Sequence, residues 1–98
     1  QKGFFIMKII FSHNGASFET DYPGTGAGHA KLYRVPVEYS EDGYYIGVWQ
    51  DTEIEPEPGC AVGEARLLCH ARLENNGADG GGLLLKTMET YDGAECHA

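Results

Sequence analysis

The stretch from Tyr33 to Trp49, YRVPVEYSEDGYYIGVW, specifies a structure more clearly than any other part of this chain. Its first half alternates apolar and polar residues, which is the period of a β-strand buried on one face. Its second half is rich in aromatic and β-branched residues, and Asp42-Gly43 lies between the two halves. Asp-Gly between two such runs is a strong signal for a tight turn. The stretch therefore predicts a β-hairpin over residues 33–50 that forms the centre of the fold.

A two-residue loop at Asp42-Gly43 is the register that we favour. In this register Tyr39 lies opposite Ile46, and both belong to an apolar face of the hairpin. The opposite face is mixed in character and carries Arg34, Glu38, Tyr45, Gly47 and Trp49. We favour this register because it separates the apolar residues from the mixed set more cleanly than its alternative does.

A three-residue loop that includes Glu41 is the alternative register. It shifts the second strand by one residue, and a shift of one residue moves every side chain of that strand to the other face. Tyr45 and Trp49 would then join Val35 and Val37 in the core. The two registers therefore disagree about whether these aromatic rings are packed inside the protein or presented on its surface.

Apolar runs bounded by turn residues predict further strands. They cover residues 4–12, 16–22 and 83–91, with a turn at His13-Asn14-Gly15 and Phe18 pointing inward. The segment from Glu64 to Glu74 consists of good helix formers, but its apolar residues alternate, so we favour a strand over a helix at 62–75. The tail at 94–98 carries no predicted element.

Strands separated by turn signals predict a mainly β fold. We expect a small curved antiparallel sheet or an open barrel of about five strands around the 33–50 hairpin. The alternative is an α+β fold in which a helix at 62–75 packs on the sheet. The 98 residues are enough for a single domain. Met7 begins a sequence that is typical of a natural start, so residues 1–6 are expected to be an added or upstream-translated extension.

The chain is acidic, with a net charge of −8 and an isoelectric point near 4.8. This charge works against binding to a phosphate backbone or an anionic membrane, because such binding depends on excess lysine and arginine. We therefore expect no nucleic acid and no membrane among the partners. A basic protein or a cationic small molecule is the better expectation.

Cys60, Cys69 and Cys96 are an odd number of cysteines, so they cannot all pair within one chain. A cytoplasmic protein with reduced thiols fits this count best. The cysteines and histidines lack the spacing of a zinc site, so we expect no metal and no cofactor. The glycines at 24–28 are followed by strand residues, which argues against a phosphate-binding loop. No catalytic motif is present, and an enzyme is not the favoured class.

The mixed face of the favoured hairpin is the candidate binding surface. Tyr45 and Trp49 beside Glu38 suit a cationic ligand, and the same aromatic residues suit a protein interface. Gly47 leaves room for a ligand or a partner backbone, and Arg34 lies on the same face. The competing interpretation is that the two aromatic rings belong to the core.

These observations predict a non-enzymatic acidic binding module that engages a protein partner through a β-sheet face. A thin sheet with apolar residues on both sides must cover its second face, so we expect a homo-oligomer. One alternative is a binding protein for a small cationic or aromatic ligand. A second alternative is a small enzyme whose site forms between subunits.

Overall fold

The structure, a computed structural model, describes residues 6–22, 27–50, 61–75 and 83–98. These residues form seven antiparallel strands and no helix: β1 (Met7–His13), β2 (Ala16–Tyr22), β3 (Gly28–Pro36), β4 (Tyr44–Gln50), β5 (Arg66–Asn75), β6 (Leu83–Thr90) and β7 (Glu95–His97). The prediction of a mainly β fold is confirmed. The extension expected at residues 1–6 lies almost wholly outside the described residues.

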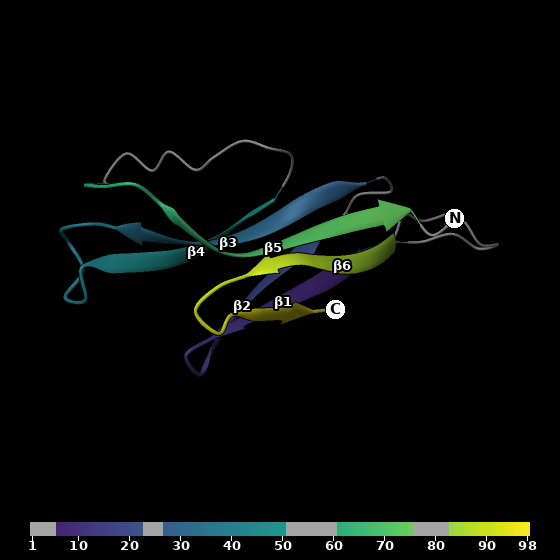
Figure 1. Cartoon of the computed structure of the whole chain (residues 1–98), viewed down its shortest axis with the longest axis horizontal. Coiled ribbons are helices and arrows are strands. Elements are labelled where there is room, and N and C mark those ends of the chain that lie inside the picture. Colours follow the sequence, from purple (N-terminus) through teal and green to yellow (C-terminus); the bar gives the residue numbers. More distant parts are fainter. Residues whose placement is uncertain (1–5, 23–26, 51–60, 76–82) are drawn as a thin grey trace.

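The strands form two stacked sheets rather than one curved sheet or an open barrel. One sheet has three strands in the order β2-β1-β7, and the other has four in the order β4-β3-β5-β6. Figure 1 shows β5 and β6 over β1 and the short β7, with β3 and β4 continuing to one side. The count is therefore seven strands in two layers, where the sequence predicted about five.

The β1–β2 connection is a tight turn of the predicted kind. Asn14 and Gly15 both have positive φ, at 51° and 80°, and His13 pairs with Ala16 across the turn. A two-residue turn with positive φ at both positions matches the twist of the flanking strands, and asparagine and glycine tolerate that conformation best. The predicted hairpin of residues 16–22 with the first strand is confirmed.

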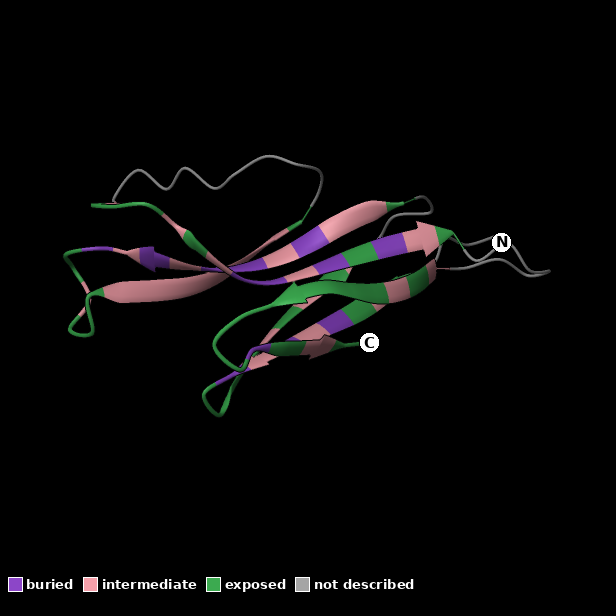
Figure 2. Ribbon diagram, in the orientation of Figure 1, coloured by how far each residue is buried: buried purple, intermediate pink, exposed green. Residues whose placement is uncertain are grey.

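The main core lies between the two sheets. Ile9 and Phe11 of β1 are fully buried against the four-stranded sheet. The residues that meet them are small or branched: Ala30 and Leu32 of β3, and Leu68, Cys69, Ala71 and Leu73 of β5. We call the face of the four-stranded sheet that carries Ala30 and Leu32 its inner face, and the opposite face its outer face. Figure 2 shows the buried segments gathered in β1, β3 and β5.

The buried face of β3 changes in the middle of the strand. Leu32 pairs with Cys69 of β5, whereas Tyr33 pairs with Leu67, so Leu68 is an extra residue that forms a β-bulge. Adjacent residues of a strand point to opposite faces, and yet Leu32 and Tyr33 are both buried. The strand therefore buries its inner face before the bulge and its outer face after it.

A second core covers the outer face beyond the bulge. Its buried members are Tyr33, Val35 and Val37 of the β3 segment, and its half-buried members are Tyr45, Trp49, Ala61, Ala65 and Leu67. No residue of the three-stranded sheet belongs to this cluster. We call this end of the four-stranded sheet, residues 33–37, 43–49 and 66–67, the overhang, because it extends past the three-stranded sheet (Figure 1).

The predicted hairpin exists, but both predicted registers are wrong. Val35 pairs with Tyr45, and the backbone N–H of Val37 donates to the carbonyl oxygen of Gly43 at 2.9 Å, which leaves residues 38–42 as the loop. Within the loop the N–H of Gly43 donates to the carbonyl oxygen of Ser40 at 3.0 Å. This wider turn leaves Tyr39 68% exposed, whereas the favoured register placed it in the apolar face.

The pairing of Val35 with Tyr45 means that Tyr45 and Trp49 share the face of Val35 and Val37. The three-residue alternative assigned these rings to the correct face, although its loop was too short. The favoured two-residue register assigned them to the wrong face. The cause is that only Gly43 adopts positive φ here, so Asp42-Gly43 does not form the two-residue turn that its sequence indicates.

Two further predictions have different outcomes. The segment that was open between strand and helix is β5, so the strand prediction is confirmed and the α+β alternative with a helix at 62–75 is wrong. The tail was predicted to carry no element, but Glu95–His97 forms β7 and pairs with β1. Asp92 and Gly93 have positive φ of 54° and 78°, and this turn directs the tail back toward β1.

The observed register makes a stability prediction. Leu32→Ala should lower the free energy of unfolding by about 2–5 kcal/mol, because it opens a cavity in the main core. Tyr39→Ala should change it by no more than about 0.5 kcal/mol, because the side chain lies in the exposed loop. Urea unfolding of the two variants measures both values. A loss for Tyr39→Ala as large as that for Leu32→Ala would instead support the two-residue register.

Candidate functional site

The structure divides the five predicted binding residues between three places. Tyr45, Gly47 and Trp49 lie on the outer face of the overhang, with the second core. Arg34 pairs with Ile46, which packs on the main core, so Arg34 lies on the inner face. Glu38 is exposed in the loop that follows β3. The five residues therefore do not form one surface, and a binding role for each of them stays a prediction.

The aromatic residues of the outer face pack on one another. The ring of Trp49 lies edge-on to Tyr33, with 5.6 Å between their centroids, and 6.4 Å from the ring of Tyr45. A Cβ atom at Gly47 would lie only 2.9 Å from the indole and 3.3 Å from the Tyr45 ring. The space that Gly47 leaves is thus occupied by rings of its own strand. Both rings are half-buried, and a role for them in binding a cationic ligand stays a prediction.

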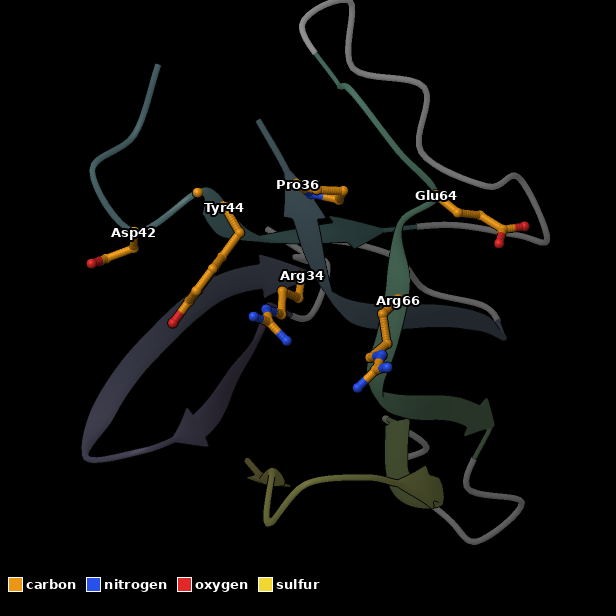
Figure 3. Close-up of a pocket in the computed structure, with 7 residues that line it drawn as sticks. Arg34, Pro36, Asp42, Tyr44, Glu64 and Arg66 are labelled. Atoms are coloured by element: carbon orange, nitrogen blue, oxygen red, sulfur yellow. The ribbon is translucent and has the colours of Figure 1, made fainter. Parts of the chain in front are cut away.

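The inner face of the overhang presents two arginines side by side. Arg34 of β3 and Arg66 of β5 are directly paired across the two strands, so their side chains leave the sheet on the same face. Figure 3 shows the two guanidinium groups pointing to the same side of the sheet, with Tyr44 beside Arg34. They are two of the three arginines in a chain whose net charge is −8.

These arginines line an open space that we call the arginine hollow. It measures about 330 Å³ and is lined by His13, Asn14, Arg34, Tyr44, Arg66 and Asp92. The first two residues come from the end of the β1–β2 hairpin, and the others come from the overhang and from the turn before β7. The hollow therefore lies where the space between the two sheets opens to solvent, next to the point where the main core ends.

The positive charge in the hollow is only partly balanced. The guanidinium carbon of Arg34 lies 4.2 Å from the centroid of the Tyr44 ring, a cation–π contact that orients the group without neutralising it. Within the part of the chain that the structure describes, Arg66 forms one ion pair, with Asp92 at 3.4 Å, in which both side chains are more than half exposed. An exposed pair of this kind contributes at most about 1 kcal/mol. The two arginines and the one aspartate that line the hollow therefore leave a net charge of one positive unit.

His13 continues the buried face of β1 into the wall of the hollow. Ile9, Phe11 and His13 alternate along the strand, and His13 is only 7% exposed. Its Nδ1 atom has no hydrogen-bond partner among the described residues. A buried polar atom without a partner costs about 1–3 kcal/mol. The wall of the hollow therefore includes a residue with an unsatisfied polar atom, and that atom is itself shielded from solvent.

Two further hollows adjoin the arginine hollow. One is a hollow of about 200 Å³ between Arg34, Arg66 and the start of β4, with Asp42 and Glu64 at its two ends (Figure 3). The other measures about 360 Å³ and is lined by Arg66, Leu67, Tyr91 and Asp92. The arginine hollow shares Arg34, Tyr44 and Arg66 with the first of these and Arg66 and Asp92 with the second, so each adjoins it.

Sequence reasoning identified Arg34 but missed the other members of this site. His13 follows the alternation of Ile9 and Phe11, and that pattern could have placed it at the end of a buried face. Arg66 had no such signal, because its position beside Arg34 depends on the pairing of β3 with β5 and on the bulge between them. Tyr44 was assigned to the hairpin without a role.

A histidine pair lies on the outer face, away from the hollow. The Nδ1 atom of His29 lies 2.7 Å from the Nε2 atom of His70, so one ring donates a hydrogen bond to the other. The pKa of His70 is lowered, first by burial and then by the positive charges of His29 and Lys31. The described residues contain no cluster of three or more ligands that could hold a metal ion.

Two cysteines from different sheets meet in the main core. Cys69 of β5 is fully buried, and Cys96 of β7 packs against the same cluster. A hydrogen bond from the Cys69 thiol, followed by one from the Thr87 hydroxyl, lowers the pKa of Cys96 to about 6, against the opposing effect of burial. The same contact with Cys96 and then burial raise the pKa of Cys69. Cys60 lies outside the described residues.

Comparison with protein families, curated proteins and solved structures finds no match to this chain. Among the described residues no helix is long and apolar enough to cross a membrane. The function is therefore argued from the geometry of the described residues alone.

The pKa of Cys96 makes a prediction about reactivity. A thiolate is the reactive form of cysteine, so alkylation of Cys96 by iodoacetamide should rise with a midpoint near pH 6 while Cys69 stays unmodified. Thr87→Val should move the midpoint upward, and Thr87→Ser, which keeps the hydroxyl, should not. Mass spectrometry of the modified peptides measures both. A midpoint near the ordinary cysteine value of 9.0 would contradict the prediction.

Proposed function

We propose that this protein is a non-enzymatic binding module that engages a protein partner through the inner face of the overhang. One observation carries the proposal. The four-stranded sheet continues past the three-stranded sheet that covers it, and the uncovered part is hollowed instead of flat. A sheet face that is left open beside an otherwise packed core is a suitable place for a partner.

The residue types on this face support the proposal. Tyr44 and Arg34 are in contact, and tyrosine and arginine are enriched among the residues that dominate protein interfaces. Both belong to paired strands, with Pro36 opposite Tyr44, so the backbone holds them in place. Residues positioned by a sheet lose less conformational entropy on binding than residues of a loop do.

The charge of the overhang refines the expected partner. The net charge of −8 favours basic proteins or cationic molecules over most of the surface. Within the arginine hollow the charges of Arg34, Arg66 and Asp92 sum to one positive charge, and Asp42 and Glu64 line the neighbouring hollow. We therefore assign the overhang to a partner that is not basic at the point of contact, and we retain the basic or cationic partner as a proposal for the acidic remainder.

Self-association is a second part of this proposal. Strand β6 is an edge of the four-stranded sheet, and most of it is exposed, including Leu84 and Met88 (Figure 2). A bulge at Met88 brings Lys86 and Glu89 to the same face. If two copies pair their β6 strands about a twofold axis that passes between Thr87 and Met88, Lys86 of each copy lies opposite Glu89 of the other. This complementarity favours a dimer through β6.

The expected cytoplasmic location also stays part of the proposal. It is supported by the odd number of cysteines and by the two free thiols in the core, Cys69 and Cys96. Thiols persist in the reduced state in the cytoplasm.

Selection of a random peptide library on the whole protein tests the binding module. We expect a shared sequence among the selected peptides, and about tenfold weaker binding of those peptides to Tyr44→Ala, a loss of about 1.4 kcal/mol. Tyr39→Ala is the matched control, because Tyr39 is an exposed tyrosine of the same hairpin and lines none of the three hollows. If no shared sequence emerges, or if both variants bind alike, the overhang is not the binding face.

Light scattering over a dilution series tests the dimer. The natural sequence should give a species larger than a monomer, and Lys86→Glu should shift it to the monomer because like charges then face each other across the pair. Combining Lys86→Glu with Glu89→Lys should restore the dimer. A monomer at every concentration of the natural sequence would contradict self-association. If Lys86→Glu forms as much dimer as the natural sequence does, β6 is not the interface.

A further inference from the structure

The arginine hollow combines features that together specify a ligand. Arg34 and Arg66 face each other across two paired strands, and like charges in that arrangement destabilise a sheet. We propose that the arginine hollow binds a carboxylate group carried by an acidic peptide, with both guanidinium groups as donors. This inference rests on the proposed function, since it names the chemistry that the overhang recognises in its partner.

The two arginines are suited to a planar anion. A guanidinium group presents its N–H donors as a rigid fork that matches the two oxygens of a carboxylate. The Tyr44 ring holds the Arg34 group at 4.2 Å, so this fork is oriented before any ligand arrives. Arg66 spends one contact on Asp92 at 3.4 Å and keeps its remaining donors. A carboxylate between the two groups would replace their repulsion by two attractive contacts.

The local charge selects a carboxylate over a phosphate group. Two guanidinium charges less the one carboxylate charge of Asp92 leave a single positive charge in the hollow. Asp42 and Glu64 at the ends of the neighbouring hollow add negative charge nearby. A phosphate monoester carries about −1.5 to −2 charges at neutral pH and would not be balanced, whereas a carboxylate carries one.

His13 provides an independent reason for a polar ligand at this place. Its imidazole is more than nine-tenths buried in the wall of the hollow, and its Nδ1 atom has no partner among the described residues. Because the Nδ1 atom is shielded from solvent, the ring would have to turn toward a polar occupant of the hollow to gain the hydrogen-bond partner that the described residues do not provide.

The space beside the arginine hollow indicates that the ligand is a peptide instead of a free acid. A lone carboxylic acid would occupy only the space next to the arginines. The adjoining hollow of about 360 Å³ shares Arg66 and Asp92 with the arginine hollow and is also lined by Tyr91, so it can hold an apolar neighbour of the acidic residue. We therefore expect an acidic residue flanked by an apolar one to bind better than acetate does.

Nuclear magnetic resonance titration of the whole protein tests the inference. The probes are a capped leucine-glutamate-leucine peptide, its glutamine counterpart, sodium acetate and inorganic phosphate. We expect the glutamate peptide to shift the Nε–Hε resonances of Arg34 and Arg66 saturably, and to bind about tenfold more tightly than the glutamine peptide. Its binding should weaken as salt is added, because the attraction is between charges.

Variants separate the hollow from the general charge of the protein. Arg34→Gln and Arg66→Gln should each weaken binding of the glutamate peptide by about tenfold. Arg72→Gln removes the same charge from the outer face and should leave binding within about twofold, because Arg72 pairs with His29 away from the hollow. The spectrum of each variant confirms that it is folded, and the shifts in the natural sequence stand independently of any variant.

Three results would overturn the inference. They are equal binding of the glutamate and glutamine peptides, tighter binding of phosphate than of the glutamate peptide, and a loss in Arg72→Gln as large as in Arg34→Gln. The library selection described above distinguishes a failure of the carboxylate assignment from a failure of the proposed function. If library selection gives a neutral sequence that depends on Tyr44, the binding module stands and the carboxylate assignment is wrong, whereas an absence of any selected sequence refutes the module itself.

Discussion

The single extra residue at Leu68 determines how the rest of this structure is arranged. It lets β3 bury its inner face as far as Leu32 and its outer face from Tyr33 onward, so one strand serves two cores. Without this change of face, the overhang would turn its apolar residues toward open solvent beyond the three-stranded sheet. The bulge therefore explains both the second core and the polar hollow on its other side. Bulges of this kind commonly redirect side chains next to functional sites.

Local patterns in the sequence predicted the elements better than their partners. Asn14-Gly15 formed the expected turn because both residues adopt positive φ, and the alternation in residues 66–75 correctly indicated a strand. The two-residue turn predicted at Asp42-Gly43 was wrong because Ser40 accepts hydrogen bonds from the N–H groups of Asp42 and Gly43 and closes a wider loop. A dipeptide pattern cannot reveal these hydrogen bonds. The strand at Glu95–His97 was missed because three residues carry no period, and its existence depends on a partner at the other end of the chain.

In the candidate site, too, the sequence indicated notable residues but not how they are paired. Arg34 and the aromatic residues were recognised as notable, but the sequence could not show that they point to opposite sides of the sheet. That separation depends on the register of the β3–β4 pair, where a shift of one residue exchanges the faces. The pairing of Arg34 with Arg66 depends on a contact between distant segments and on the bulge beside it. Periodicity within one segment contains neither piece of information.

The position of β7 has a consequence for how this protein matures during synthesis. Strand β1 is synthesised before every other described strand, but its second neighbour in the sheet is Glu95–His97, the last described strand. Phe11 lies opposite Cys96, so this side of β1 stays unpaired until β7 has been synthesised. Contacts between such distant segments form slowly and leave strand edges exposed in the meantime. The β1–β7 pairing is therefore expected to be among the last contacts of the three-stranded sheet to form.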